Sequence, residues 1–187
     1  MKNRRKKIIG GIAVTVILVV GGGYAWAATS DQQELDNSNP EEIEVTEEQA
    51  LTTFSDEYDQ TVESLELETS RDGYMYDVES YDNQTEYNTT IDANSGDIID
   101  TKSDNDDDED EEEHRYELDQ QEAISREEAS EIAENEAGGG QAREWKLERV
   151  SDSTQIWEVN VLENGNETEV AINAEDSEVL EVEQDDD

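Results

Sequence analysis

The feature that most constrains the fold of this chain is an internal repeat. Three segments recur in the same order: 45–50 as 124–129, 76–78 as 157–159, and 91–93 as 172–174. The separation between equivalent residues grows from 79 at the start of the repeat to 81 at its end, as expected when surface turns take up small insertions. The repeat therefore predicts two small modules of the same fold.

Each copy begins with a helix signal and continues with strand signals. Thr46 and Ser125 each stand three residues before a Gln or Glu, which is the spacing of a capping box. Apolar residues follow at helical spacing, and glycines at 138–140 end the second helix. Alternating apolar residues then predict strands, with hairpin turns at 72–73 and 164–165. The predicted fold is α+β, with two small modules that each pack one helix on a three- to four-stranded antiparallel sheet.

Aromatic residues recur at alternating positions of the predicted strands. They are Tyr74, Tyr76, Tyr87, Trp145 and Trp157. This spacing favours core positions, and the alternative is a stripe that binds a ligand. Met75 and Tyr81 fall on the opposite face from Tyr76, so they are the candidate partner surface of the first module.

The first 28 residues predict an export segment. Five Lys and Arg residues precede an apolar run that starts at Ile8, and such positive charge stays in the cytoplasm. The stretch from Ile8 to Ala28 has about the 20 residues that cross a bilayer, which favours an uncleaved transmembrane helix. Residues 25–27 resemble a signal peptidase site, so a cleaved signal peptide and a secreted protein are the alternative. In both cases the chain after Thr29 is predicted to be extracytoplasmic.

The exported part is strongly acidic. The chain carries 54 Asp and Glu against 12 Lys and Arg, and from Thr29 onward the charge is −47 because only seven of the cations remain. Such a surface repels nucleic acid and attracts cations or basic protein surfaces. The predicted organisation is a signal or membrane anchor at 1–28, a polar spacer at 29–42, a first domain at 43–101, an acidic disordered linker at 102–115, a second domain at 116–183 and an acidic tail at 184–187.

The sequence offers no recognisable catalytic centre. It has no Cys, its one His is His114 at the end of the acidic linker, and its glycine runs do not precede a helix as a phosphate loop would. The acidic run 104–113 lacks the glycine of an EF-hand loop, which leaves a solvated spacer or loose binding of cations such as calcium. Asp92 and Asp97 flank a predicted turn and either bond its backbone or hold an ion. We expect no enzyme activity, no cofactor and no dedicated metal site.

The order of these motifs resembles the PepSY domain, a small extracytoplasmic module. The first copy carries the resemblance at 46–50, 76–78 and 91–98, and the second at 125–129, 157–159 and 172–179. The second copy departs from the closing motif at Asn173 and Ser177. The resemblance implies two tandem non-catalytic domains that restrain peptidases or regulate local proteolysis.

We therefore expect a membrane-tethered interaction module that binds a peptidase or another envelope protein. The alternative is an acidic cell-surface spacer that binds cations loosely and has no specific protein partner.

Overall fold

The computed structural model describes residues 40, 43–70, 73–82, 85–105 and 115–184 of the 187-residue chain. The predicted export segment, most of the polar spacer, His114 and the tail from residue 185 lie outside the described residues. In the part of the chain that is described, no helix is long and apolar enough to cross a membrane. The transmembrane helix therefore stays a prediction from the sequence.

Each half of the chain contains one α-helix followed by four strands. The elements in chain order are α2 (Glu47–Glu57), β1 (Thr61–Ser70), β2 (Gly73–Asp82), β3 (Thr85–Asp92), β4 (Ile98–Asn105), the short 3₁₀ helix η2 (Gln120–Glu122), α3 (Arg126–Ala137), β5 (Gln141–Ser151), β6 (Thr154–Glu163), β7 (Asn166–Asn173) and β8 (Val179–Gln184).

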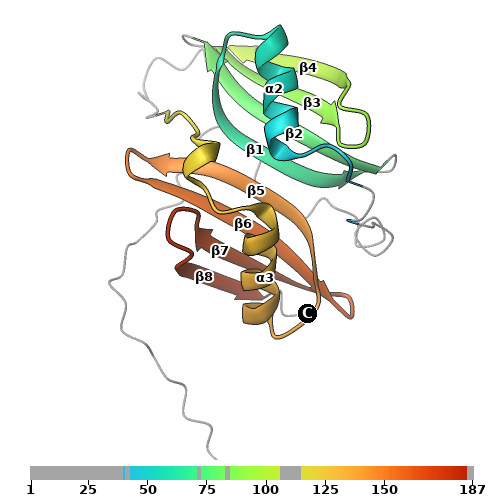
Figure 1. The fold of residues 1–187 in the computed structure, drawn as a ribbon, viewed down its shortest axis with the longest axis vertical. Helices are drawn as coiled ribbons and strands as arrows, with labels where there is room; N and C mark the ends of the chain where they lie inside the picture. Colours follow the sequence, from blue (N-terminus) through green and yellow to red (C-terminus); the bar gives the residue numbers. More distant parts are fainter. Residues whose placement is uncertain (1–39, 41–42, 71–72, 83–84, 106–114, 185–187) are drawn as a thin grey trace, which may run out of the picture.

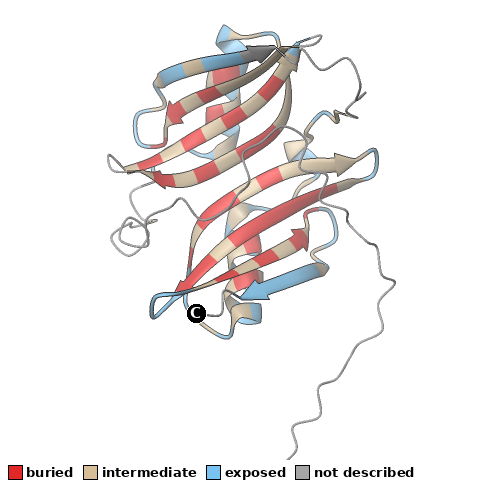
Figure 2. Ribbon diagram, turned by 180° about the vertical axis from the view of Figure 1, so that it is seen from behind, coloured by how far each residue is buried: buried red, intermediate tan, exposed pale blue. Residues whose placement is uncertain are grey.

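All eight strands form one antiparallel sheet. Its strand order is β4-β3-β2-β1-β5-β6-β7-β8, so the two repeats join through β1 and β5. Figures 1 and 2 show both helices on the same face of this sheet, while the other face has no helix over it. The α+β prediction is confirmed in this form, as a single large antiparallel sheet with two helices. The pairing of the two repeats into one sheet was not predicted.

Both helices begin where the sequence predicts. Thr46 caps α2 in a full capping box, because its hydroxyl accepts from the Gln49 amide and the Gln49 side chain accepts from the Thr46 amide. Ser125 caps α3 by accepting from the Glu128 amide at 3.2 Å, which is the hydroxyl half of the predicted box. α3 ends at Gly138, whose φ of 87° is the left-handed conformation that glycine adopts without strain.

The hydrophobic core lies between the helices and the sheet and runs through both repeats. Ala50 and Phe54 of α2, and Ala129 and Ala133 of α3, are buried against it. In most strands buried and half-buried residues alternate, whereas β6 is buried along most of its length (Figure 2). This alternation is the expected result of covering one face of a pleated sheet.

The acidic linker begins later than the sequence predicts. Residues 102–105 were expected to be disordered, but β4 continues to Asn105 and pairs in register with β3 as far as Thr85. The prediction was wrong here because cross-strand backbone bonds order a polar strand that buries little. At the other end, Arg115 pairs with Glu86 at 2.6 Å. Residues 106–114 lie outside the described residues.

Candidate interaction surface

The aromatic residue of the second strand in each repeat is a buried structural residue. Tyr76 is 0% exposed and Trp157 is 3% exposed. The Tyr76 hydroxyl donates to the Val45 carbonyl at 2.8 Å, and the Trp157 indole N–H donates to the Ile124 carbonyl at 3.0 Å. Burial raises the pKa of the Tyr76 hydroxyl, which keeps it a donor. The core interpretation is confirmed for four of the five aromatic positions, which are Tyr74, Tyr76, Trp145 and Trp157; Tyr87 is half-buried.

The closing motif of each repeat forms a tight turn. The Asp92 carboxylate accepts from the Asn94 and Ser95 amides at 2.9 and 2.7 Å, and the bond from Ser95 is the main reason that the pKa of Asp92 is lowered. In the second repeat Asn173 accepts from the two equivalent amides. Asp92 therefore bonds its own turn, as the first of the two interpretations predicts. Ser177 occupies the position of the turn glycine with a φ of 66°.

The structure places Met75 and Tyr81 on the helix-free face of β2 without bringing them together. Both are half-buried, and Asp77 and Glu79 lie between them on the same face. The guanidinium of Arg115 covers the Tyr81 ring at 5.5 Å. The two residues therefore do not form one continuous apolar patch.

Charged side chains cross the helix-free face from one repeat to the other. Strand register places Asp77, Glu66, Lys146 and Glu158 side by side on four neighbouring strands. Lys146 Nζ lies 2.8 Å from a Glu148 carboxylate oxygen. Within the described ranges, no group of three or more His, Asp or Glu side chains is arranged to hold a metal ion.

Burial changes the proton affinity of several of these groups. Burial, with repulsion from Glu66 and Asp77, raises the pKa of Glu68 to about 8. Burial, with repulsion from Glu148, raises the pKa of Glu158 to about 7. Burial alone would lower the pKa of Lys146, but Glu148 and other carboxylates raise it overall. Lys146 therefore stays charged, while the Glu68 and Glu158 carboxyls change their protonation state near neutral pH.

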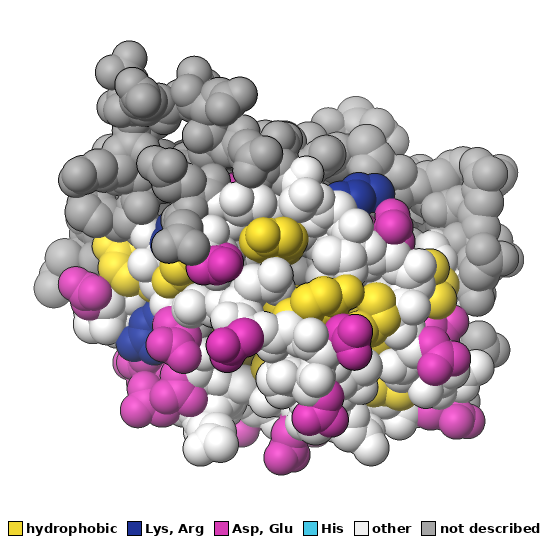
Figure 3. Space-filling view, turned by 90° about the horizontal axis from the view of Figure 1, so that it is seen from above, with side chains coloured by type: hydrophobic (Ala, Val, Ile, Leu, Met, Phe, Trp, Pro, Cys, Tyr) yellow, Lys and Arg dark blue, Asp and Glu magenta, His cyan; other side chains and the backbone are white. Residues whose placement is uncertain are grey.

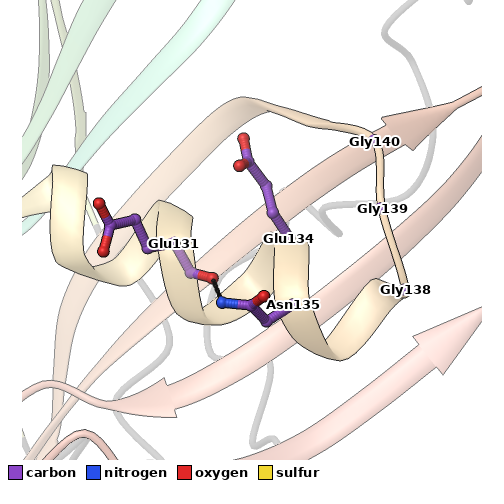
Figure 4. A pocket seen from close by; sticks show the side chains of 6 residues that line it. All are labelled: Glu131, Glu134, Asn135, Gly138, Gly139 and Gly140. Carbon is purple, nitrogen blue, oxygen red and sulfur yellow. Dashed lines mark hydrogen bonds between the residues drawn. The ribbon is translucent and has the colours of Figure 1, made fainter.

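A shallow hollow lies at the C-terminal end of α3 (Figure 4). It is lined by Glu131, Glu134, Asn135 and the glycines at 138–140. A Glu134 carboxylate oxygen accepts from the Ala142 amide at 3.0 Å, and the Asn135 side chain donates to the Glu131 carbonyl at 2.6 Å. The negative helix end and the carboxylates have the same sign, which disfavours an anionic ligand. The bonds of Asn135 and Glu134 stay within the helix and link it to β5.

The largest exposed hydrophobic side chains lie on the two edge strands. Ile99 of β4 is 58% exposed, and Leu180 and Val182 of β8 are 42% and 45% exposed. Viewed from the end of the molecule where β4 lies, small hydrophobic groups are interrupted by Asp and Glu side chains (Figure 3). Such separated apolar residues are ordinary for a protein surface.

Two segments of the chain match one family model. The model is the peptidase propeptide and YPEB domain, PepSY, and it matches residues 44–102 and 123–183. These matches together cover more than half of the chain. The chain belongs to the PepSY family. It carries two PepSY domains in tandem, as the sequence motifs predict.

A similar protein has a solved crystal structure. It is a candidate lipoprotein from Clostridium difficile 630, with 27% sequence identity and a TM-score of 0.66. The likeness covers 76% of this chain and 95% of the other chain. This share exceeds either PepSY match alone, so it includes parts of both domains. No curated protein matches the chain.

Sequence reasoning missed the residues where the two PepSY domains meet. Glu47 and Arg126 occupy the same position of the repeat and form an ion pair at 2.7 Å. Glu66 and Lys146 also occupy equivalent positions and face each other across β1 and β5. The sequence did hold a signal: at each of these two repeat positions the first copy has a Glu and the second copy has a cation, in a chain with few cations.

Proposed function

We propose that this protein is a membrane-tethered, non-catalytic PepSY protein that binds an extracytoplasmic peptidase or another envelope protein. The observation that carries the proposal is the pair of matches to a domain described from peptidase propeptides. The basic and apolar start of the chain supports export and tethering. Similarity to a candidate lipoprotein supports a location in the cell envelope.

The helix-free face of the first domain is the proposed partner surface. The two apolar members of this face on β2, Met75 and Tyr81, are only half-buried. Their strand neighbours include Glu68 and Glu86, so a partner would meet apolar and acidic groups together. Such a surface suits a partner that presents both apolar and basic groups.

Peptidase inhibition by the full chain tests this proposal. The chain, kept in mild detergent, is titrated into the secreted and surface peptidases of its host at moderate salt. We expect dose-dependent inhibition that Met75→Ala with Tyr81→Ala weakens and that Leu180→Ala, on the edge strand β8 of the second domain, leaves unchanged. A folded sample that neither inhibits a peptidase nor retains any envelope protein, at physiological or high salt, would contradict it.

The second candidate function is an acidic surface spacer that concentrates cations such as calcium. The observation that favours it is the charge of −47 after Thr29, which attracts cations whatever the fold. An equally acidic scrambled sequence in place of residues 43–184 should then serve equally well in cells. Loss of function with the scrambled sequence would overturn the spacer and leave the interaction module.

A further inference from the structure

The two PepSY domains pair with each other through equivalent positions. Within the first domain Leu67 is in register with Tyr76, and within the second Leu147 is in register with Trp157. Since Tyr76 and Trp157 are equivalent residues of the repeat, Leu67 and Leu147 are equivalent too. The strands β1 and β5 therefore have the same place in their domains.

The β1–β5 interface is symmetric in its register. Its pairs are Ser64 with Glu148, Leu65 with Leu147, Glu66 with Lys146, and Leu67 with Trp145. Exchanging the two domains turns the Leu65–Leu147 pair into the Leu67–Trp145 pair and leaves Glu66 opposite Lys146, so a pseudo-twofold axis passes between Glu66 and Lys146. An interface of this kind normally joins two identical subunits, in which the residue on the axis meets its own copy.

A second pair of equivalent residues meets on the other side of the sheet. Glu47 is the first residue of α2 and Arg126 is the first residue of α3, each directly after its N-cap. The Arg126 Nε and a Glu47 carboxylate oxygen are 2.7 Å apart, and each side chain is 14% exposed. Arg126 also lies over the Trp145 ring at 5.1 Å. We call Glu47–Arg126 and Glu66–Lys146 the axial pairs.

The intrinsic preferences of helix and strand positions do not favour the two cations of the axial pairs. An arginine in the first turn of a helix is unfavourable, because the helix dipole places positive charge there. Lysine is disfavoured within strands, and Lys146 lies near the middle of β5 with its side chain 19% exposed. Both cations belong to the second domain, in an exported chain with only seven Lys and Arg residues. Arg126 forms its ion pair with Glu47 of the first domain, whereas Lys146 stands opposite Glu66 in the strand register and also pairs with Glu148 of its own strand.

We propose that the axial pairs determine which PepSY domains pair with each other. The surface formed by β1 and α2 of the first domain accepts a domain that has cations at both axial positions. The second domain of the same chain is such a domain. Two first domains would oppose Glu to Glu at both positions, and two second domains would oppose cation to cation. Like charges directly opposite on neighbouring strands are unfavourable, and a buried charge without a partner is costly. This selection does not depend on the identity of the extracytoplasmic partner.

Charge reversal and charge exchange in the full chain test the proposal. Arg126→Glu with Lys146→Glu makes both axial pairs acidic. Adding Glu47→Arg and Glu66→Lys to that variant restores opposite charges with the domains exchanged. The control combines Lys102→Glu, Gln121→Glu and Gln141→Glu, three exposed positions that give the same net charge as the double variant.

The measurement is amide hydrogen exchange in residues 64–67 and 145–148, with residues 76–79 and 157–160 as internal references for the folded core. We expect the double variant to exchange about tenfold faster or more at the interface, and the quadruple variant to return to within about twofold of the native rate. The control should keep native rates.

Two results would overturn the proposal. One is a double variant that exchanges like the control. The other is a quadruple variant that exchanges as fast as the double variant. If the double variant does not fold, the quadruple variant decides, because recovery of the fold by two further charge reversals supports the proposal and an unfolded quadruple variant rejects it.

Discussion

The two PepSY domains make the same backbone contacts with different side chains. A phenol in the first domain and an indole in the second donate to the carbonyl before the helix cap. Asp92 and Asn173 accept from equivalent turn amides, and Gly96 and Ser177 take the same left-handed conformation. At the axial pairs, by contrast, the two domains differ in the sign of charge. The comparison teaches that the repeat preserves hydrogen-bond geometry, while the two domains carry opposite charges at the equivalent positions where they meet.

Truncation of the equivalent aromatic residues should cause the largest loss of stability. We expect Tyr76→Ala and Trp157→Ala each to lower the free energy of unfolding by about 3–5 kcal/mol, because each leaves a large cavity. Tyr76→Phe keeps the ring and loses the hydroxyl that donates to Val45, so it should cost about 1 kcal/mol. Urea unfolding followed by far-UV circular dichroism measures all three. A much smaller loss in one domain would break the equivalence of the two positions.

The pH dependence of stability should distinguish Glu68 from Glu158. Their pKa values are about 8 and about 7 in the folded protein, against 4.5 ordinarily. The folded chain therefore holds protons that the unfolded chain releases above about pH 4.5, and both groups make stability fall as pH rises. We expect Glu68→Gln to make the loss of stability less steep between about pH 4.5 and pH 8. Glu158→Gln should do the same between about pH 4.5 and pH 7.

Unfolding in urea at several pH values between 4 and 9 tests these expectations. The exposed change Glu183→Gln is the control, since it alters the same chemical group on an edge strand. If the stability of the Glu68→Gln variant falls with pH as steeply as that of the native protein, burial of the Glu68 carboxyl does not destabilise the folded chain at high pH.

Substitution of the turn residues Gly96 and Ser177 should have the smallest effect on stability. Gly96 and Ser177 have φ values of 77° and 66°, a region that costs a residue with a side chain about 1 kcal/mol. Gly96→Ser should therefore lower the melting temperature, and Ser177→Gly should raise it, although the latter also loses an exposed contact with Glu128 at 3.4 Å. A side chain at Gly96 would meet Val45 at an ordinary 3.6 Å, so steric overlap does not enter. Equal shifts in the same direction would contradict the equivalence of the two turns.

Much of each domain follows from local sequence. The caps at Thr46 and Ser125, the glycine that ends α3 and the alternation of the strands all depend on residues close together in the chain. The buried aromatic residues follow from the same alternation. The partner surface does not, because whether Met75 and Tyr81 lie together depends on the neighbouring strands and on Arg115.

The sequence by itself determined that the chain repeats one helix-and-meander unit, because periodicity and capping are local properties. Only the tertiary structure decided that β1 pairs with β5 in a single sheet. Every strand edge offers the same backbone donors and acceptors, so hydrogen bonding alone does not choose a partner. The choice comes from side chains that are distant in sequence, among them Glu47 with Arg126 and Glu66 with Lys146, whose meaning is visible once they face each other.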